Sequence, residues 1–409
     1  MAVVRPFSAL RPRPELAARI ASVPYDVVNT DEARALATDP LSFLHVSRAE
    51  VDLPADTNPY ADAVYARAVT NFDVLKQSSL IHEPRPAVYL YRLRMGRHEQ
   101  IGVAACFSID EYQHDLIKKH EKTRPEKEND RTRHIIDTRA QSGPVLLTYR
   151  EDAAVDRAVS QGATSAPLYD FAAPDGVQHT IWRTEPDVGN AIVLAFKDVA
   201  ALYIADGHHR AASAARAYEH FAGQKDTQPG GEHAWFLAVA FPDRQTQILP
   251  YHRTVKDLDG RTPDALLASL RTKFPVEPGT ATPKRKGECA MFLNGAWYTL
   301  QLDAGSQANG ATADPVASLD VSRLHDQVLE PLLKIQDERT DKRIDFVGGI
   351  RGTGELERIV GRGAAAVAFS MHPTTVTDLM AIADAGAIMP PKSTWFEPKL
   401  RDGLLTHLI

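Results

Sequence analysis

Hydrophobic and polar positions along the chain change their period several times, and the clearest change lies near the middle. An apolar run at 202–206 ends in an Asp-Gly pair, and an Ala-rich segment of good helix formers follows at 211–221. This order predicts a strand, a tight turn and a helix. The continuously apolar run at 234–241 predicts a buried central strand.

Elsewhere the same patterns predict both helices and strands. Apolar residues recur at helical spacing in five segments: 60–78, 153–161, 264–274, 319–333 and 375–385. Alternating or short apolar runs predict strands at 42–48, 87–91, 100–109, 142–149, 179–182, 190–196, 344–349 and 364–371. Hairpin turns are expected at 95–97 and at Asn294-Gly295. We therefore predict an α/β fold with α+β character and a mixed sheet.

The chain is long enough for more than one domain, and its character changes near residue 258. We expect a first domain at 1–255 and an additional C-terminal α+β lobe at 256–409. The stretch 389–400 holds several prolines together with Trp395 and Phe396, which disfavours a regular helix or strand. Because a tail this apolar is rarely left free, we expect it to dock and to return to the active-site cleft.

Composition places the chain among globular proteins and restricts its partners. Hydrophobic residues make up 44% and charged residues 24% of the 409 positions, and the net charge of -6 offers no general attraction to nucleic acid. Cys106 and Cys289 form neither a zinc pattern nor a disulfide framework, which fits a reducing cytoplasm. Residues 1–10 hold no long apolar h-region and no stretch reaches about 18 apolar residues, so neither secretion nor a membrane span is expected.

The turn Asp206-Gly207-His208-His209-Arg210 carries the most specific chemistry of the chain. Its histidines and arginine stand at the predicted start of a helix, where free backbone N–H groups and the helix dipole favour an anion. Gly207 lets the backbone approach that anion closely, and a phosphate is the natural guest. In the alternative interpretation, Asp206 caps the helix and the tip is a solvated loop.

The most charged part of the protein is the stretch 118–131. It is either a solvated helix face or a loop that presents side chains, and Pro125 favours the loop because proline interrupts a helix. One polar cluster then holds His120, Glu121 and Thr123, and the other holds Glu128, Asp130 and Arg131. A hydroxyl acceptor needs a base, for which Glu121 is our candidate, and magnesium at a triphosphate accepts one or two carboxylates.

Two further segments offer ligand-binding groups. Tyr25 and Asp26 follow a proline at a strand edge, where they either form a packed turn or present a hydroxyl and a carboxylate to a ligand. In the tail, Lys392 offers a cation, and Ser393 and Thr394 offer hydroxyls for phosphate oxygens. The alternative for the tail is a purely packing role.

The segment from Leu202 to Arg216 resembles the ParB/sulfiredoxin superfamily, whose signature is a strand that ends in Gly-x-His-Arg or Asp-Gly-His-His-Arg before an Ala-containing helix. The resemblance implies a ParB/sulfiredoxin-like core with a nucleotide phosphate at the turn. His208 stands where sulfiredoxins carry their catalytic Cys, so that reduction chemistry is not expected. The motif is more similar to that of the free serine kinases, which phosphorylate L-serine with a nucleotide and magnesium.

Further motifs extend a resemblance to nearly the whole chain. They are similar to those of a large bacterial and archaeal family of about this length whose function is unknown, and whose members often lie beside serine-biosynthesis genes. The motifs are Pro6-Phe7 with Leu10-Arg11-Pro12, Pro24-Tyr25-Asp26-Val27-Val28, Lys119-His120-Glu121-Lys122-Thr123, Asp130-Arg131, Asp206-Gly207-His208-His209-Arg210 and Pro391-Lys392-Ser393-Thr394-Trp395-Phe396-Glu397-Pro398-Lys399.

The resemblance implies transfer of a phosphoryl group from ATP or ADP, with Mg²⁺, to a small hydroxyl compound, foremost L-serine. Catalysis is assigned to Glu121 as the proton acceptor and to His120, Asp206 and His209. Nucleotide binding is assigned to Gly207, His208, His209, Arg210, Arg131, Lys392, Ser393 and Thr394. The acceptor is assigned to Tyr25, Asp26 and Thr123, and the metal to Asp206 and Glu128.

Two other functions stay open for the sequence. The first is a nucleotide-binding regulator that changes conformation with CTP or ATP and has no kinase activity on small molecules. The second is a DNA-associated ParB-like protein, which the negative net charge and the lack of a basic helix-turn-helix disfavour. Nucleotide turnover that depends on added L-serine separates kinase from regulator. The oligomeric state, the nucleotide and the direction of the reaction are left open.

Overall fold

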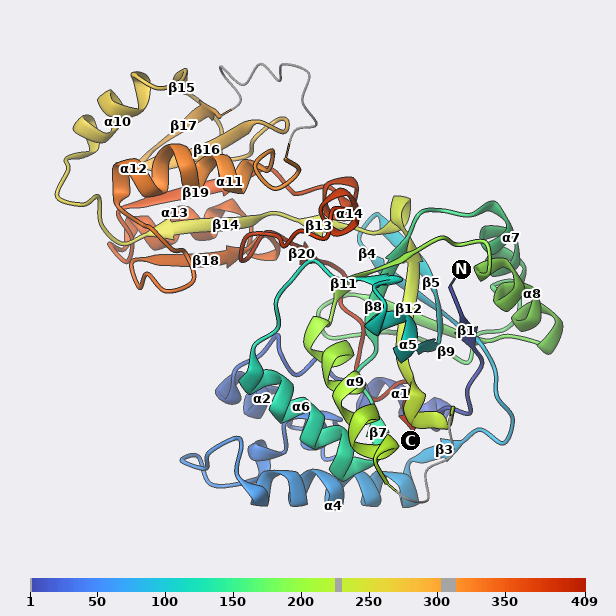
Figure 1. The fold of residues 1–409 in the computed structure, drawn as a ribbon. Helices are drawn as coiled ribbons and strands as arrows, with labels where there is room; N and C mark the ends of the chain where they lie inside the picture. Colours follow the sequence, from blue (N-terminus) through green and yellow to red (C-terminus); the bar gives the residue numbers. More distant parts are fainter. Residues whose placement is uncertain (1, 225–229, 303–313) are drawn as a thin grey trace. The chain divides into compact units, whose positions relative to one another are not determined.

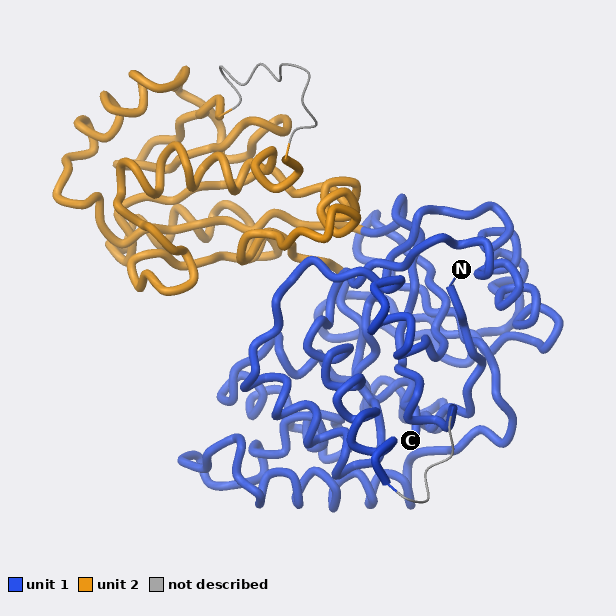
Figure 2. The backbone as a smooth tube through the Cα atoms, viewed as in Figure 1, with its two compact units in different colours: residues 1–246, 398–409 blue, residues 247–397 orange. Residues whose placement is uncertain are grey.

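The computed structural model describes residues 2–224, 230–302 and 314–409. The chain forms two compact units, which are drawn in different colours in Figure 2. Unit 1 contains residues 1–246 and 398–409, and unit 2 contains residues 247–397. Each unit combines helices with a β-sheet (Figure 1), so the predicted mixed α/β class is confirmed.

Unit 1 is organised around a nine-stranded mixed sheet. Strand β11 runs parallel to β6, β12 runs parallel to β8, and the other strand pairs are antiparallel. Strand β1 pairs with β5, and the remaining strands follow the order β6 (Ile117–Lys118), β11 (Leu202–Asp206), β8 (Val145–Tyr149), β12 (Trp235–Pro242), β5 (His98–Ser108), β4 (Tyr89–Met95), β10 (Gln178–Arg183) and β9 (Tyr169–Ala172), with β1 at Val4–Arg5. As predicted, β12 is a central strand.

Helices pack on this sheet through apolar side chains and close the main core of unit 1. Ile192 and Phe196 of α8 and Ala214 of α9 join Val103 and Leu147 of the sheet in one buried cluster. The helices around the sheet are α5 (Ile109–Gln113), α6 (Pro125–Thr138), α7 (Ala153–Gly162), α8 (Pro186–Phe196) and α9 (His208–Ala222). Helices α6 and α9 lie side by side (Figure 1).

A second cluster of unit 1 forms among the N-terminal elements. Phe43, Val46 and Phe72 pack there with Leu10 and Leu80. The elements of this region are β2 (Leu10–Pro12), η1 (Pro14–Leu16), α1 (Ala17–Ile20), α2 (Thr30–Leu36), α3 (Leu44–Ser47), η2 (Ala49–Asp52), α4 (Asp62–Ser78) and β3 (Leu80–His82). The shorter elements β7 (Ala140–Gln141), η3 (Glu232–Ala234), η4 (Asp243–Gln245) and β21 (His407–Leu408) complete unit 1.

Unit 2 is built on a six-stranded antiparallel sheet. Its order is β15 (Val276–Pro278), β17 (Ala296–Gln301), β16 (Glu288–Leu293), β19 (Val367–Met371), β14 (Tyr251–Val255) and β18 (Ile344–Gly348). The helical segments are α10 (Pro263–Arg271), α11 (Asp320–Leu324), η5 (His325–Leu329), α12 (Glu330–Leu333), η6 (Gly349–Arg351), α13 (Thr353–Gly361) and α14 (Val376–Asp384). A separate pair joins β13 (Ile248–Leu249) to β20 (Trp395–Phe396).

The two units divide at a different place from the expected boundary at 255/256. Strand β14 pairs with β18 and β19 of the second sheet, so the division lies at 246/247. The last twelve residues of the chain belong to unit 1, where β21 pairs with β7 and the side chains of Leu404 and Leu405 are buried. The expected C-terminal lobe at 256–409 is therefore not one continuous unit, because residues 398–409 belong to unit 1.

Most predicted elements are present, and two strand predictions are wrong. The hairpins at 95–97 and Asn294-Gly295 are confirmed, and Asn294 and Gly295 both have the positive φ of a two-residue hairpin turn. Residues 190–196 instead belong to α8, whose Ile192, Ala195 and Phe196 bury one helical face. Residues 44–47 form a helical turn rather than a strand. No helix in the described parts of the chain combines the length and apolar character of a bilayer crossing.

Candidate functional site

The turn between β11 and α9 leads directly into the N-terminus of α9, which has no side-chain cap among the described residues. Gly207 precedes the helix with φ of 96°, a conformation that side chains disfavour. A β-carbon at this position would lie 2.8 Å from Nε of Arg210. Both constraints require glycine. Within the described residues no side chain caps the first N–H groups of α9, so these donors are left for another acceptor.

Arg210 and Lys399 form a positive cluster with Asp206 beside this turn. The Arg210 guanidinium is buried, donates to the Asp206 carboxylate at 2.9 Å and also donates to the carbonyl of Pro144. Lys399 Nζ lies 3.5 Å from the other Asp206 oxygen. Burial alone would raise the pKa of Asp206, but Lys399, Arg210 and His208 hold that pKa well below its usual value. Arg210 is therefore held in place rather than extended to a ligand.

Strand pairing brings the segment after β6 to the same sheet edge as the turn after β11. The two strands run parallel, with Leu202 opposite Ile117. The His120 ring meets the His208 ring edge to face at 4.4 Å, and the His120 N–H donates to His208 Nε2 at 3.4 Å. His208 Nδ1 lies 3.6 Å from Oε2 of Glu121. Burial lowers the pKa of both His120 and His208 to about 3, so both rings are neutral at pH 7.

His209 ties the same segment to the helix from the outside. Its Nε2 accepts the Arg124 N–H at 3.0 Å, and burial lowers its pKa. Nearby, the Thr123 hydroxyl donates to Glu128, whose other oxygen lies 3.4 Å from Arg216. Of the predicted cluster, His120 and Glu121 thus contact His208 at the start of α9, whereas Thr123 contacts Glu128 of α6.

The carboxylates assigned to Mg²⁺ do not fit that role in this arrangement. Both oxygens of Asp206 face cations, and both oxygens of Glu128 have partners of their own. An ion at either position would have to displace Lys399 or Arg216, so we derive no step through a metal.

The second charged cluster lies on a helix and not on a loop, because Pro125 begins α6 instead of interrupting it. Proline at the first helical position loses no hydrogen bond. On this helix, Asp130 accepts from the Tyr65 hydroxyl at 2.9 Å and from Arg131 at 2.8 Å. Arg131 also donates to the carbonyl of Ser47 and stacks over Tyr25, with its Cζ atom 4.3 Å from the ring centroid.

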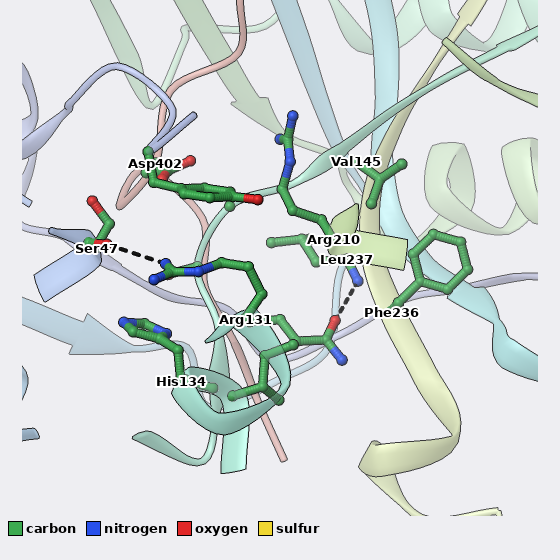
Figure 3. Close-up of a pocket in the computed structure, with 14 residues that line it drawn as sticks. Ser47, Arg131, His134, Val145, Arg210, Phe236, Leu237 and Asp402 are labelled. Atoms are coloured by element: carbon green, nitrogen blue, oxygen red, sulfur yellow. Dashed lines mark hydrogen bonds between the residues drawn. The ribbon is translucent and has the colours of Figure 1, made fainter. Parts of the chain in front are cut away.

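A small pocket lies beneath this arrangement (Figure 3). Its volume is about 40 Å³, and Arg131, Arg210, Tyr25 and Ser47 are among the residues that line it. Asp402 from the C-terminal segment also faces it. Burial raises the pKa of Asp402 to about 7 against the opposing charge of Arg210.

The sequence did not single out Lys399 or Asp402 as site residues. Lys399 stands at the end of the tail motif, but Asp402 follows it without any motif of its own. The only sequence feature that pointed to this segment was its apolar character, which predicts that the tail packs against the protein but not where it packs.

The predicted site residues of the tail belong to unit 2. The Ser393 hydroxyl donates to the carbonyl of Pro390 at 2.7 Å, and the Lys392 carbonyl accepts from Arg253. Thr394 lies in the same segment, directly before β20. The association of Lys392, Ser393 and Thr394 with the turn at Gly207 stays a prediction.

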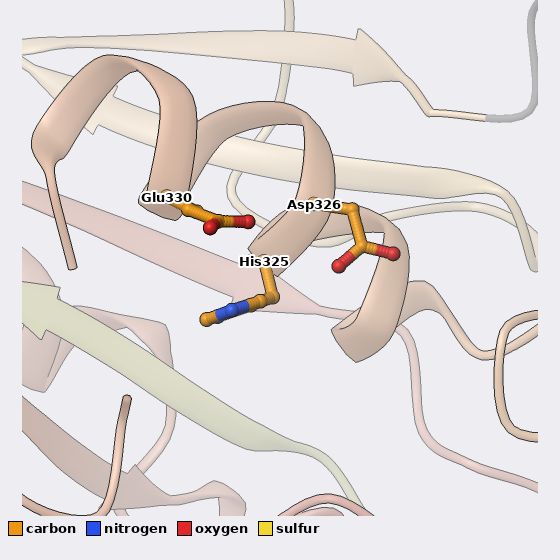
Figure 4. A group of neighbouring side chains, drawn as sticks. All are labelled: His325, Asp326 and Glu330. Carbon is orange, nitrogen blue, oxygen red and sulfur yellow. The ribbon is translucent and has the colours of Figure 1, made fainter. Parts of the chain in front are cut away.

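Unit 2 holds another group of side chains with metal-binding chemistry (Figure 4). His325, Asp326 and Glu330 are the only three such residues within the described ranges whose ligand atoms lie within 4.8 Å of one another. Two of the three are exposed and the third is half-buried, and exposed acidic groups commonly carry no ion. We assign this group no role.

Comparison with known proteins gives one family and several distant structures. The family described as "Protein of unknown function (DUF1015)" matches residues 4–322. A search of curated proteins found no match. One solved structure that resembles this chain is a free serine kinase mutant in complex with AMP. The two chains are 10% identical, the match covers 74% of this chain and 92% of the kinase, and the TM-score is 0.36.

Two other solved structures are similarly distant. SbnI with a C-terminal truncation, from Staphylococcus aureus, has 12% identity, covering 75% of this chain and 87% of its own, at a TM-score of 0.38. A conserved hypothetical protein from Pyrococcus furiosus is 14% identical to this chain. The match covers 75% of this chain and 95% of that protein, at a TM-score of 0.34. Similarity at this level does not assign an activity, so the chemistry of this chain has to come from its own side chains.

Proposed function

We propose that this chain, which belongs to the DUF1015 family of proteins of unknown function, transfers a phosphoryl group from ATP or ADP to a small hydroxyl acceptor, foremost L-serine. One observation carries the proposal. The parallel pairing of β6 and β11 places the carboxylate of Glu121 beside the uncapped N-terminus of α9. A base and an anion site next to each other are what phosphoryl transfer to a hydroxyl requires.

The phosphates of the nucleotide bind the first N–H groups of α9 in this proposal. Gly207 allows close approach, and the positive end of the helix dipole adds to the attraction. Arg210 and Lys399 lie on either side of Asp206 and contribute positive charge from behind the turn. The strand, turn and helix then act as a ParB/sulfiredoxin-like nucleotide site.

Glu121 acts as the general base. Its side chain is 43% exposed, so a small acceptor reaches it, and His208 orients it from 3.6 Å. The acceptor oxygen forms a bond to the terminal phosphorus as the bond from that phosphorus to the bridging oxygen breaks. The hydroxyl proton goes to Glu121, and ADP or AMP leaves with the electron pair of the broken bond. Tyr25, Asp26 and Thr123 contact the acceptor, and His120 and His209 hold the loop that carries Glu121.

A direct test incubates the protein with ATP or ADP, magnesium and a panel of small alcohols and hydroxy amino acids. Mass spectrometry then detects the phosphorylated acceptor. We expect a product with L-serine, and nucleotide turnover that depends on the acceptor. Nucleotide binding without any phosphorylated acceptor would contradict the proposal and favour a nucleotide-binding regulator.

The variant Glu121→Gln tests the assignment of the base. Because glutamine keeps the shape but cannot accept the proton, we expect transfer to fall by at least about 100-fold while nucleotide affinity changes by less than about 3-fold. Glu126→Gln, an exposed residue in the first turn of α6, is the matched control and keeps full activity. If affinity falls as much as the rate, Glu121 is not the base.

A further inference from the structure

Several residues that line the pocket of Figure 3 hold buried polar atoms without a hydrogen-bond partner. Within the described chain these atoms are Nε of Arg210, Oγ of Ser47 and Oδ1 of Asp402. All three residues are buried. A buried polar atom costs free energy unless a partner meets it, so this pocket suits a guest that forms hydrogen bonds.

The lining of the pocket carries more positive than negative charge. It includes the two arginines Arg131 and Arg210 and a single acidic residue, Asp402. The carboxylates that pair with the arginines, Asp130 and Asp206, are not among the lining residues. Because a cavity lined by one sign of charge attracts the opposite sign, this lining favours an anionic guest.

Arg131 has a donor left for such a guest. It donates from Nε to Asp130 at 2.8 Å and from Nη1 to the carbonyl of Ser47 at 3.1 Å, and no described residue accepts from Nη2. The guanidinium stacks over the Tyr25 ring, with Cζ 4.3 Å from the ring centroid, which fixes its plane. A guanidinium held in one plane matches the planar geometry of a carboxylate.

The acidic side chain of Asp402 is compatible with an anion beside it. Burial, opposed by Arg210, Arg131 and Arg401 and reinforced by Asp26, raises the pKa of Asp402 to about 7. A second carboxylate in the pocket disfavours the ionised form of Asp402 still more. The carboxyl group of Asp402 therefore keeps its proton beside such a guest and donates it to one of the guest's oxygens.

We propose that this pocket binds a carboxylate group of the acceptor through Arg131, Tyr25 and Asp402. This inference rests on the proposed phosphoryl transfer and narrows its substrate class from hydroxyl compounds to small hydroxy acids. Arg210 connects the pocket with the turn, since it lines the pocket and also donates to Asp206 at 2.9 Å. Its charge adds to the attraction from a fixed position.

The size of the pocket agrees with such a group. A single water needs about 10–15 Å³ by this measure of volume, and the pocket offers about 40 Å³. Roughly three non-hydrogen atoms therefore fit, which is the size of a carboxylate group. A phosphate group is larger, so the pocket favours the acceptor over the nucleotide.

Calorimetry on the full chain without nucleotide tests this site with three compounds. L-Serinamide keeps the hydroxyl and ammonium groups of L-serine but replaces the carboxylate by a neutral amide, and 3-hydroxypropionate keeps the carboxylate but lacks the ammonium group. We expect L-serinamide to bind at least about 10-fold more weakly than L-serine, and 3-hydroxypropionate to bind measurably. Equal affinity for L-serine and L-serinamide, or no binding of either carboxylate, would overturn the proposal.

The variant Asp402→Asn gives this site a distinct pH signature. Because a carboxylate guest requires the protonated form of Asp402, we expect the affinity of the original chain for 3-hydroxypropionate to fall by up to about 10-fold between pH 7 and pH 8. Asparagine cannot ionise, so the variant should keep its affinity over this range. Asp56→Asn, in an exposed loop, is the control and behaves like the original chain. Loss of 3-hydroxypropionate binding in a folded Asp402→Asn variant would overturn the proposal.

The variant Tyr25→Phe removes one donor and keeps the ring that stacks with Arg131. We expect its affinity for L-serine and for 3-hydroxypropionate to fall about 3- to 10-fold, and its weak affinity for L-serinamide to change less. Tyr298→Phe, on β17 of unit 2, is the matched control and keeps all three affinities. Unfolding curves verify that both variants are folded. Unchanged affinity for both carboxylates in Tyr25→Phe would remove the hydroxyl from the site and contradict the proposal.

A transfer assay with the same compounds distinguishes this inference from the proposed function. Selective binding of the two carboxylates without phosphoryl transfer contradicts the proposed function and leaves the carboxylate site in place. Transfer to L-serinamide as fast as to L-serine contradicts the carboxylate site and leaves phosphoryl transfer in place.

Discussion

Burial keeps the two inner histidines of the site neutral. It lowers the pKa of His120 and of His208 to about 3, and a neutral imidazole both donates and accepts. His208 uses this capacity when it accepts from the His120 N–H while its other nitrogen faces Glu121. The histidines of the motif therefore position the loop of Glu121, and the positive charge at the turn comes from Arg210 and Lys399.

Asp402 makes stability depend on pH. Burial, reinforced by Asp26 and opposed by Arg210, Arg131 and Arg401, raises its pKa from 3.8 to about 7. The folded protein then binds a proton that the unfolded chain releases, so the free energy of unfolding falls as the pH rises from about 4 to about 7. We expect Asp402→Asn to remove this loss and to be more stable at pH 8, by up to about 4 kcal/mol.

Urea unfolding of both proteins at pH 4.5 and pH 8 checks this expectation. The difference in unfolding free energy between the variant and the original chain should widen toward pH 8. Parallel pH profiles would show that Asp402 is ionised in the folded protein throughout this range.

At the scale of elements, the parallel pair β6 and β11 is what assembles the site. Chain segments that leave the carboxyl ends of adjacent parallel strands meet at one sheet edge. The loop after β6 reaches α9 for this reason, although Glu121 and His208, the first residue of the helix, lie 87 positions apart in the sequence. Helix α6 then packs along α9, where Glu128 meets Arg216 and where Arg131 lines the same pocket as Arg210.

The geometry of the turn from β11 to α9 leads us to expect that Gly207→Ala lowers both stability and nucleotide affinity. The added β-carbon meets Arg210 at 2.8 Å in a conformation with φ of 96°. We expect the unfolding free energy to fall by about 1–3 kcal/mol and nucleotide affinity to fall at least about 10-fold. Gly176→Ala is the control, since its φ is 81° but no atom lies within 4 Å of the added carbon.

Denaturant unfolding and nucleotide titration of the two variants separate backbone strain from the site. The control should lose about 1–2 kcal/mol of stability and none of its nucleotide affinity. Equal affinities for the two variants would mean that the turn at Gly207 does not bind the nucleotide.

At the scale of the whole molecule, the chain leaves unit 1 at residue 246 and returns to it at residue 398. The returning segment pairs β21 with β7, buries Leu404 and Leu405, and supplies Lys399 and Asp402 to the candidate site. Unit 2 is thus an insertion into unit 1.

Deletion of residues 398–409 should therefore destabilise unit 1 and spare unit 2. Loss of several buried apolar side chains costs about 5 kcal/mol or more, a large part of the stability of an ordinary domain. Hydrogen–deuterium exchange resolved by peptide measures each unit separately. We expect protection to fall in β4, β5 and β12 and to persist in β14, β16 and β19. Equal loss in both sheets would contradict the division into two units.

Local patterns of the sequence determined much of the secondary structure and the centre of the site. The strand, Gly207 and helix at 202–222, the Asn294-Gly295 hairpin and helix α4 depend on residues within one or two turns of each other. Turn geometry and side-chain periodicity act over that range, so they can be read directly from the residue order.

Contacts between distant segments were decided only by the tertiary structure. The helix at 186–196 forms where an apolar run suggested a strand, because burial against the sheet selects among conformations that local propensity leaves nearly equal. Lys399 and Asp402 reach the turn at Asp206 through the pairing of the last residues with unit 1. Periodicity within a segment carries no information on its distant partners, so the sequence by itself predicted a docked tail but not its carboxylate in the pocket.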